Sequence, residues 1–262
     1  MPRLYPLFSG SSGNCYYLGS SERGILIDAG RSARQIVTAL SENSLDIKNV
    51  MGIFITHEHS DHISGLRVLA SRNRIPVFAS PGTIKALSEK NIIDEKVDIS
   101  PVTPEGMEIG DMFAVPFHTS HDCAEGFGYT VLTSDGRKTA FATDTGYVTG
   151  EMDTALEGSD TVVIESNHDV GMLQNGFYPY VLKERILSEK GHLSNDACAD
   201  KIMQLVRQGS TRFLLAHLSR ENNIPVLAEN TSVCVLSQNG MKRNEDYILK
   251  VAPEKGGEAL IY

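Results

Sequence analysis

Tryptophan is absent from the 262-residue sequence, and cysteine is scarce. The four cysteines are widely spaced and include no CxxC pair, so we expect reduced thiols in a cytoplasmic protein. No apolar run reaches about 18 residues, so no membrane-spanning helix is expected. The start, Met1-Pro2-Arg3-Leu4, lacks the long apolar core that is typical of a signal peptide.

Basic residues are fewer than acidic ones, 24 Lys and Arg against 33 Asp and Glu. The formal net charge of −9 at pH 7 argues against a protein that holds nucleic acid by bulk electrostatics alone. It does not exclude a nuclease, because a metal-lined cleft supplies positive potential locally, where a phosphate binds. Tandem repeats, low-complexity tracts and long linkers are missing as well. We therefore expect residues 1–262 to form a single domain with a substantial core.

The hydrophobic pattern alternates between strands and helices. Short apolar runs predict strands near the start of the chain, and residues 97–141 are expected to be mostly strand and turn. The last third returns to helix–strand alternation. This mixture indicates an α/β sandwich with helices covering the sheets. The expected strands include 4–8, 16–18, 24–27, 51–55 and 213–216, and the expected helices include 197–206 and 224–236.

Residues 57–62 carry the densest chemistry in the chain. His57, His59, Asp61 and His62 follow directly after the apolar run 50–55. Alternation along an extended chain would place the first three on one side, and a turn at Asp61 would swing His62 toward a second ion. Imidazole and carboxylate ligands suit Zn, Mn or Fe. A polar loop that merely contains histidines is the alternative, but this clustering favours a metal site.

Five strand-like runs end at, or just before, a titratable residue. In open α/β sheets, ligands gather beyond the carboxyl ends of the strands. Chance explains one or two such endings, because strands must stop somewhere polar, but five favour one shared site. The residues at these ends are Asp28, His57, Asp144, Glu165 and His217.

The motif His57-x-His59-x-Asp61-His62, preceded by Asp28-Ala29-Gly30, resembles the metallo-β-lactamase superfamily. The resemblance covers essentially the full chain and implies a four-layer αββα sandwich with a dinuclear metal centre. It also implies a metal-dependent phosphodiesterase, and most specifically an exonuclease that cuts DNA from the 5′ side. The motifs that look like the YycJ, WalJ or VicX group of bacterial proteins are Ser9-Gly10-Ser11-Ser12-Gly13-Asn14, Glu165-Ser166-Asn167-His168-Asp169, Gly191-His192-Leu193-Ser194-Asn195 and His217-Leu218-Ser219-Arg220-Glu221-Asn222-Asn223.

The resemblance further implies ligands for two divalent ions, which we expect to be Zn²⁺ or Mn²⁺. Two histidines could be the third ligand of the first ion, His121 and His118, which lies three residues before it. His121 is preferred, because it stands in the family's Ser-His-Asp context. Asp28 is expected to hold the His57 loop through hydrogen bonds. The implied ligands are His57, His59 and His121 for the first ion, Asp61, His62 and His217 for the second, and Asp144 as the bridge between them.

Glu165 and His192 are left without a ligand role. In superfamily members that cut RNA, a Glu after the bridging Asp works with a His in a Gly-His-Ser-like motif, and these two residues match in order and context. The resemblance therefore implies that His192 donates a proton to the leaving oxygen, oriented or charged by Glu165. Helix capping is the alternative, because Ser194 looks like a helix N-terminus. Asp61 is a further catalytic candidate, as acceptor of the nucleophile's proton.

Candidate substrate contacts lie in two segments. Ser11, Ser12 and Asn14 belong to a glycine-rich turn whose amides suit a terminal phosphate, although a plain hairpin turn explains the same residues. Arg220 and Asn222 follow His217 and are placed to meet a phosphate, with surface solvation as the alternative. We expect DNA as the substrate and no membrane, and no protein partner is evident from the sequence.

A small-molecule phosphodiesterase that opens cyclic phosphates is the main competing function. The acidic charge and the lack of a basic tail favour it. The matches at Glu165 and His192 argue against thioester or lactam hydrolysis, and the ligand pattern argues against a di-iron redox centre. A metal-stabilised regulator without activity would leave the proton donor without a purpose.

Overall fold

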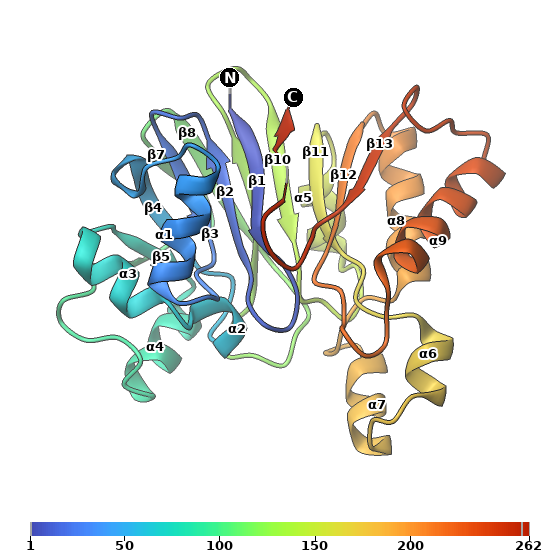
Figure 1. Cartoon of the computed structure of the whole chain (residues 1–262), viewed down its shortest axis with the longest axis horizontal. Coiled ribbons are helices and arrows are strands. Elements are labelled where there is room, and N and C mark those ends of the chain that lie inside the picture. The colour runs from blue at the N-terminus through green and yellow to red at the C-terminus, as the bar shows by residue number, and fades with distance from the viewer. Residues whose placement is uncertain (1, 258, 262) are drawn as a thin grey trace.

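The computed structural model describes residues 2–257 and 259–261 of the chain. Within this part, the strands form two mixed sheets of seven strands each, and helices cover the two outer faces (Figure 1). The four-layer αββα sandwich that the resemblance implied is therefore confirmed.

The first sheet comes from the N-terminal part of the chain and one short strand near its end. Its strands, in spatial order, are β14 (Leu260–Ile261), β1 (Arg3–Phe8), β2 (Cys15–Gly19), β3 (Gly24–Ile27), β4 (Val50–Phe54), β5 (Val77–Ala79) and β6 (Ile99–Pro101). Neighbours from β14 to β3 are antiparallel, whereas β3, β4, β5 and β6 run parallel.

The second sheet repeats this division into an antiparallel and a parallel half. Its strands, in spatial order, are β13 (Ile248–Val251), β12 (Arg212–Ala216), β11 (Thr161–Glu165), β10 (Lys138–Ala142), β9 (Phe127–Leu132), β8 (Met112–His118) and β7 (Met107–Ile109). Strands β10 to β13 are parallel, and β7 to β10 are antiparallel. Each sheet thus has a parallel half whose strand ends are free to build a site.

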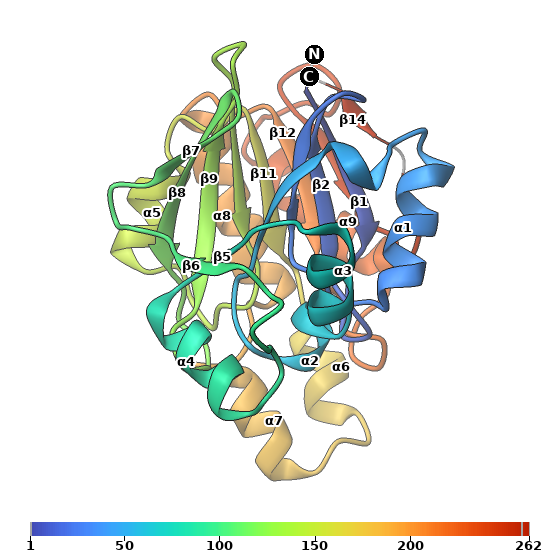
Figure 2. The ribbon, with the colours of Figure 1, turned by 90° about the vertical axis from the view of Figure 1, so that its left-hand side faces the viewer.

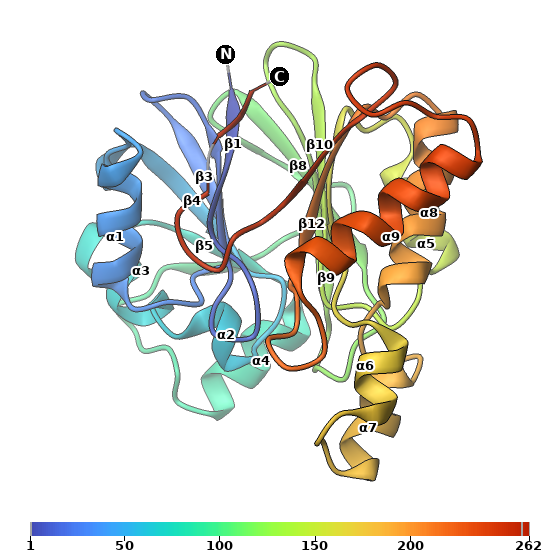
Figure 3. The same cartoon turned by 45° about the vertical axis from the view of Figure 1, so that its right-hand side comes forward.

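The helices divide between the two outer faces. In Figure 2, α1, α3 and α4 lie over the first sheet, and in Figure 3, α8 and α9 cover the second. The helices and the one 3-10 turn of the described part are α1 (Ala33–Glu42), η1 (Ile47–Asn49), α2 (Ser60–Ile63), α3 (Leu66–Asn73), α4 (Pro81–Glu89), α5 (Gly150–Leu156), α6 (Val170–Asn175), α7 (Tyr180–Leu187), α8 (Asn195–Arg207) and α9 (Pro225–Gln238).

The strands and helices expected from the sequence are confirmed, with ends shifted by one or two residues. The expected strand 24–27 coincides with β3, whereas the strand expected over 51–55 is observed at Val50–Phe54. The expected helix 197–206 lies inside α8, which begins where Ser194 accepts a hydrogen bond from the Ala197 amide. Apolar runs mark burial, but the ends of a strand also depend on its partner, which the run does not reveal.

Aromatic side chains fill the space between the sheets. The ring centroids of Phe54 and Tyr129 lie 5.4 Å apart, and those of Tyr16 and Phe141 lie 6.0 Å apart, each pair joining the two sheets. Further apolar clusters pack between each sheet and its helices. This burial fixes one sheet on the other, so that their strand ends stay together at one edge.

One helical segment lies outside the sandwich. Residues 170–187, which hold α6 and α7 and are called the α6–α7 arm below, project beyond the sheets (Figures 1 and 3).

In the described residues, no helix is both long and apolar enough to cross a membrane. The four cysteines are free thiols, as expected.

Candidate metal centre

The ends of five parallel strands, β3, β4, β10, β11 and β12, meet at one edge of the sandwich. The Nδ1 atom of His62 lies 2.7 Å from the carboxylate of Asp28, and its Nε2 atom lies 3.2 Å from Asp144 Oδ2. Glu165 Oε1 is 2.8 Å from His217 Nδ1. The prediction that these strand ends face one another is confirmed.

Three of these strand-end residues adopt the left-handed backbone conformation. The φ angles are 64° at Asp28, 56° at Asp144 and 54° at His217. Side chains other than glycine rarely adopt it, at a cost of about 1 kcal/mol or more each. The surrounding contacts must offset this cost, and the sharp turn aims each side chain back across the edge of the sheet.

The segment after β4 turns earlier than expected. Alternation was expected up to Asp61, but α2 begins at Ser60, so Asp61 and His62 belong to its first turn and His59 precedes it. The rings of His57 and His59 lie 4.5 Å apart. The helical turn brings His62 to 4.1 Å from the ring of His57, so the four side chains still converge.

His57, His59 and His121 form the first of four overlapping groups in the described residues that could hold a metal ion. The other three are Asp61, His62 and His217; His57, His62 and Asp144; and Asp144, Glu165, His192 and His217. His59 Nδ1 lies 3.3 Å from His121 Nε2. Ligands of a tetrahedral ion with bonds of about 2.0–2.1 Å stand roughly 3.3 Å apart. His57 Nε2 is buried and has no hydrogen-bond partner among the described residues. Because a bound cation would satisfy this nitrogen, the donor set fits a metal ion.

Asp61, His62 and His217 form the second group. Asp61 Oδ2 lies 3.3 Å from His217 Nε2 and 3.4 Å from His62 Nε2. Asp144 stands between the groups, with Oδ2 at 3.2 Å from His62 Nε2 and Oδ1 at 3.8 Å from His121 Nε2. The structure thus brings all seven implied ligands together, and Asp144 contacts members of both groups.

Asp28 fixes the segment that carries His57 and His62 through hydrogen bonds. It accepts hydrogen bonds from the backbone amide of Thr56 at 2.8 Å and from its hydroxyl at 3.1 Å, in addition to its contact with His62 Nδ1. Thr56 Oγ1 also lies 3.0 Å from His57 Nδ1. These contacts leave the Nε2 atoms of both histidines for an ion, which confirms the expected structural role of Asp28.

His118, the rival of His121, lies outside the cluster. Its ring is more than half exposed, packs at 5.0 Å on Phe127, and lies 3.1 Å from the carboxylate of Glu151. His121, by contrast, is buried, and its Nδ1 lies 3.0 Å from the carbonyl oxygen of Gly191. The geometry therefore favours His121 as the ligand.

Glu165 connects His192 to the cluster. Its Oε1 atom lies 2.8 Å from both His192 Nδ1 and His217 Nδ1, and its Oε2 atom accepts the backbone amides of Thr145 and Leu193. Burial favours a neutral acid, but His192 and the other hydrogen bonds outweigh it and lower the pKa of Glu165 to about 2. The Glu165 carboxylate is therefore charged, and His192 is held through Nδ1 with Nε2 left free.

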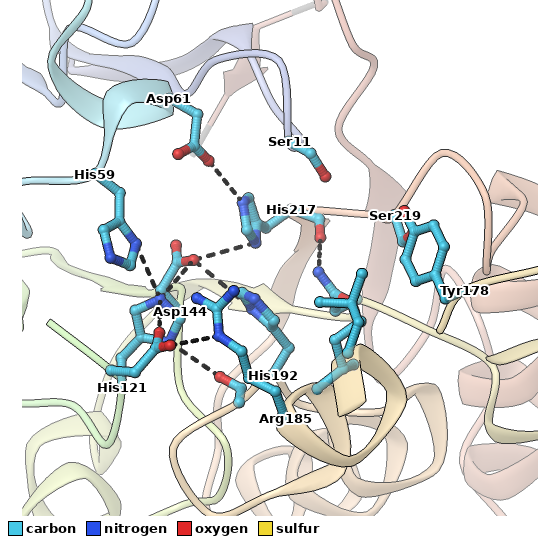
Figure 4. A pocket seen from close by; sticks show the side chains of 15 residues that line it. Ser11, His59, Asp61, His121, Asp144, Tyr178, Arg185, His192, His217 and Ser219 are labelled. Carbon is cyan, nitrogen blue, oxygen red and sulfur yellow. Dashed lines mark hydrogen bonds and ion pairs between the residues drawn. The ribbon is translucent and has the colours of Figure 1, made fainter. Parts of the chain in front are cut away.

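The groups open into a cavity of about 280 Å³ (Figure 4). Ser11 and Asp61 lie on one side of it, and His192 and Arg185 on another. Arg185 and Tyr178 come from the α6–α7 arm and were missed, because no motif around them marks a site. Asp122, which pairs with Arg185 at 2.5 Å, had a signal in the Ser-His-Asp context of His121.

The predicted substrate contacts divide into two kinds. Ser11 lines the cavity, and Arg220 is exposed and directly follows Ser219, which also lines it. Asn14 is fully buried and bonds to the turn and toward His62, and Asn222 is 1% exposed and accepts the amide of Asp169 through its carbonyl. Neither Asn14 nor Asn222 lines the cavity in this structure, and their contact with substrate stays a prediction. Ser12, the neighbour of Ser11, donates a hydrogen bond to Glu254 at 2.8 Å.

His168 is buried without a role at the centre. Both of its ring nitrogens lack a hydrogen-bond partner within the described residues, and its exposed fraction is 1%. Burial lowers the pKa of His168 from 6.5 to about 4, against the weaker opposing effect of Glu165. A proton on His168 therefore favours the unfolded chain.

We expect His168 alone to remove on the order of 3 kcal/mol of stability between pH 7 and pH 4, the equivalent of its pKa shift. Above about pH 6.5 its contribution is fully present; it falls as the unfolded residue takes up a proton and levels off below about pH 4. Chemical denaturation of chelator-treated wild type and His168→Leu at both pH values measures it. An equal loss in both proteins would contradict this assignment.

A family model described as "Beta-lactamase superfamily domain" matches residues 23–218. The chain belongs to the metallo-β-lactamase superfamily, and it is a metal-dependent hydrolase.

Two relatives are 39% identical to the chain over most of its length. The chain is 39% identical over 243 residues to "Exodeoxyribonuclease YycJ" of Bacillus anthracis, covering 92% of this chain and 91% of the relative. It is also 39% identical over 236 residues to "Exodeoxyribonuclease WalJ" of Streptococcus pneumoniae serotype 2, covering 88% and 87%. Among solved structures, the metallo-beta-lactamase fold protein YhfI from Bacillus subtilis superposes with a TM-score of 0.74 at 15% identity, covering 99% of both chains. This last likeness concerns the fold alone.

Proposed function

We propose that the chain is an exonuclease that hydrolyses DNA from the 5′ end at a dinuclear centre of Zn²⁺ or Mn²⁺. The observation that carries the proposal is Asp144 standing between two groups of metal-binding side chains, beside the pair Glu165 and His192. The names of the relatives support DNA as the substrate. We also propose that residues 1–262 act as one domain.

The chemistry that two bound divalent ions supply is activation of a water molecule and neutralisation of charge on a phosphate oxygen. The protein's part begins with holding the ligands: Asp28, Thr56 and Gly191 fix the histidine rings through their second nitrogen or neighbouring groups. Because five of the proposed ligands are imidazoles and only two are carboxylates, the centre stays cationic and favours an anionic phosphodiester.

His192 has the position of the proton donor to the leaving sugar oxygen. Although burial opposes a charge on it, the carboxylates of Glu165 and Asp144 raise the pKa of His192 above its ordinary value, so it carries a proton to give. Asp61 is the weaker catalytic candidate. Against the effect of burial, His62 and His217 hold the pKa of Asp61 well below its usual range, which makes it a poor proton acceptor and suits a ligand.

Two observations bear on DNA against a small phosphodiester. The α6–α7 arm borders the cavity through Tyr178 and Arg185 and carries the exposed side chains Phe177, Tyr180 and Val181. Exposed aromatic rings beside a cationic cleft are typical of surfaces on which nucleobases stack. The net charge of −9 favours the smaller substrate. Cyclic phosphodiester hydrolysis is therefore the second candidate.

The test is cleavage of end-labelled linear duplex DNA with Mn²⁺ or Zn²⁺, with His59→Ala as the control. We expect stepwise shortening from the 5′ end that is lost in the variant, because His59 is a proposed ligand of the first ion. Bis-(p-nitrophenyl) phosphate, hydrolysed in parallel, reports on the metal centre without any need to bind DNA. Hydrolysis of this compound with no cutting of DNA would reject the exonuclease and favour the small substrate.

A further inference from the structure

Side chains from three distant parts of the chain converge on one oxygen of Glu254. Its Oε1 atom accepts a hydrogen bond from Ser12 Oγ at 2.8 Å and lies 3.3 Å from Arg31 Nη2. Arg220 Nη2 pairs with the same oxygen. One hydroxyl and two guanidinium groups around a single anionic oxygen form the donor set that a phosphate oxygen requires.

The position of Arg31 is fixed by the glycine-rich turn. A Cβ on Gly13 would lie 2.7 Å from Arg31 Cδ, so the aliphatic part of Arg31 needs glycine there to cross the turn. Its guanidinium stands 5.5 Å from the ring of Phe8 and also bonds to Ser12 Oγ. Arg31 Nε is buried with no hydrogen-bond partner in the described part of the chain. The group is thus preorganised by its surroundings.

The charges in this cluster do not balance. Two guanidinium groups face one carboxylate, and burial together with the nearby Arg220 lowers the pKa of Arg31 from its ordinary value. A terminal phosphate carries about −1.5 to −2 charges near neutral pH and presents three acceptor oxygens. It would therefore neutralise Arg31 and Arg220 more fully than Glu254 does.

The cluster adjoins the metal centre on the side of the second ion group. A Cβ on Gly30, just before Arg31, would collide with the carbonyl oxygen of Asp61. Arg220 follows His217 by three residues, and Ser11, the neighbour of Ser12, lines the cavity itself (Figure 4). An anion bound here would sit next to a phosphodiester held between Asp61 and His192.

We propose that Ser12, Arg31 and Arg220 form a binding site for the 5′-terminal phosphate of DNA, which Glu254 occupies until substrate displaces it. The proposal rests on the proposed exonuclease function. The main chain after Glu254 is held on β1 by hydrogen bonds from Gly256 to Leu7 and from Gly257 to Pro6, both of 3.0 Å. Displacement therefore needs only a swing of the Glu254 side chain, which is about half exposed. The enzyme is thereby selective for 5′-phosphorylated ends.

The first test compares kcat/KM on duplexes that differ only in a 5′-phosphate or a 5′-hydroxyl. Wild type should prefer the phosphate by about tenfold to a hundredfold, the usual effect of a charge-assisted hydrogen-bond pair. Arg31→Gln and Arg220→Gln should bring the ratio close to one. The matched control is Arg34→Gln, which removes the same charge from an exposed position on α1 and should keep the wild-type ratio. An equal preference in all four proteins would overturn the proposal.

The second test separates this site from the nuclease activity. A methylphosphonate-linked dinucleotide, whose linkage is neutral, is titrated by calorimetry into the metal-loaded protein with and without its 5′-phosphate. Binding should require the phosphate, weaken at least tenfold in Arg31→Gln, and tighten in Glu254→Gln because the competing charge is gone. Phosphate-dependent binding that survives both arginine substitutions would place the phosphate on the metal ions and reject the site, whether or not the protein cuts DNA.

Discussion

Replacing His192 by alanine should lower the rate of DNA cleavage by roughly two to four orders of magnitude, the usual contribution of a general acid. The metal content should not change, because His192 is not among the seven proposed ligands. Its Nδ1 is committed to Glu165 at 2.8 Å, and the side chain lines the cavity, so Nε2 is the atom that can protonate a leaving sugar oxygen.

The leaving group distinguishes catalysis from a structural role. The p-nitrophenolate of bis-(p-nitrophenyl) phosphate departs without a proton, so its hydrolysis should fall far less in His192→Ala than cleavage of DNA does. A merely structural role would lower both rates equally. His118→Ala is the matched control, because this histidine pairs with Glu151 outside the cluster, and its activity should match wild type. Full DNA cleavage by a folded, metal-loaded His192→Ala protein would remove His192 from the mechanism.

The convergence of the five strand-end residues could be predicted from the sequence, because each of them stands at or near the end of a recognisable strand. Each strand that ends in a titratable residue predicts one wall of the site, and the parallel halves of the two sheets bring Asp28, Asp144 and His217 to a single edge. The left-handed turns at these three residues were not predicted, since neither Asp nor His marks that conformation as glycine does. The short helix α2 was missed for a similar reason: four residues are too few for a helical pattern.

Other parts of the site depend on contacts between distant segments. Asn14 and Asn222 lie in polar, turn-forming sequence that is usually exposed, but the structure buries both under loops that they hydrogen-bond. Glu254 accepts a hydrogen bond from Ser12, 242 positions earlier in the sequence, and no sequence pattern relates the two residues. Arg185 reaches the cavity because the α6–α7 arm folds beside it, which depends on tertiary packing rather than on the local pattern.

Removing the divalent ions should abolish hydrolysis and lower the Tm by roughly 5–15 °C. An ion present at a hundred to a thousand times its Kd stabilises the folded state by about 2.7–4.1 kcal/mol, and each kcal/mol shifts a domain of this size by about 2–4 °C. The physical reason lies in the cluster: without a cation, His57 Nε2 has no partner among the residues the structure describes, and Asp144 is buried among imidazoles. Scanning calorimetry with and without chelator, alongside elemental analysis, measures both effects.

His59→Ala makes this prediction specific to the centre. The variant loses a proposed ligand of the first ion, so it should bind fewer ions per chain and its Tm should respond less to chelator than that of wild type. His118→Ala, which leaves every proposed ligand in place, should keep the full metal content and the full shift. Hydrolysis that persists after the metal has been removed, as verified by elemental analysis, would contradict the metal centre itself, and a shift of equal size in wild type and His59→Ala would place the stabilising ion elsewhere.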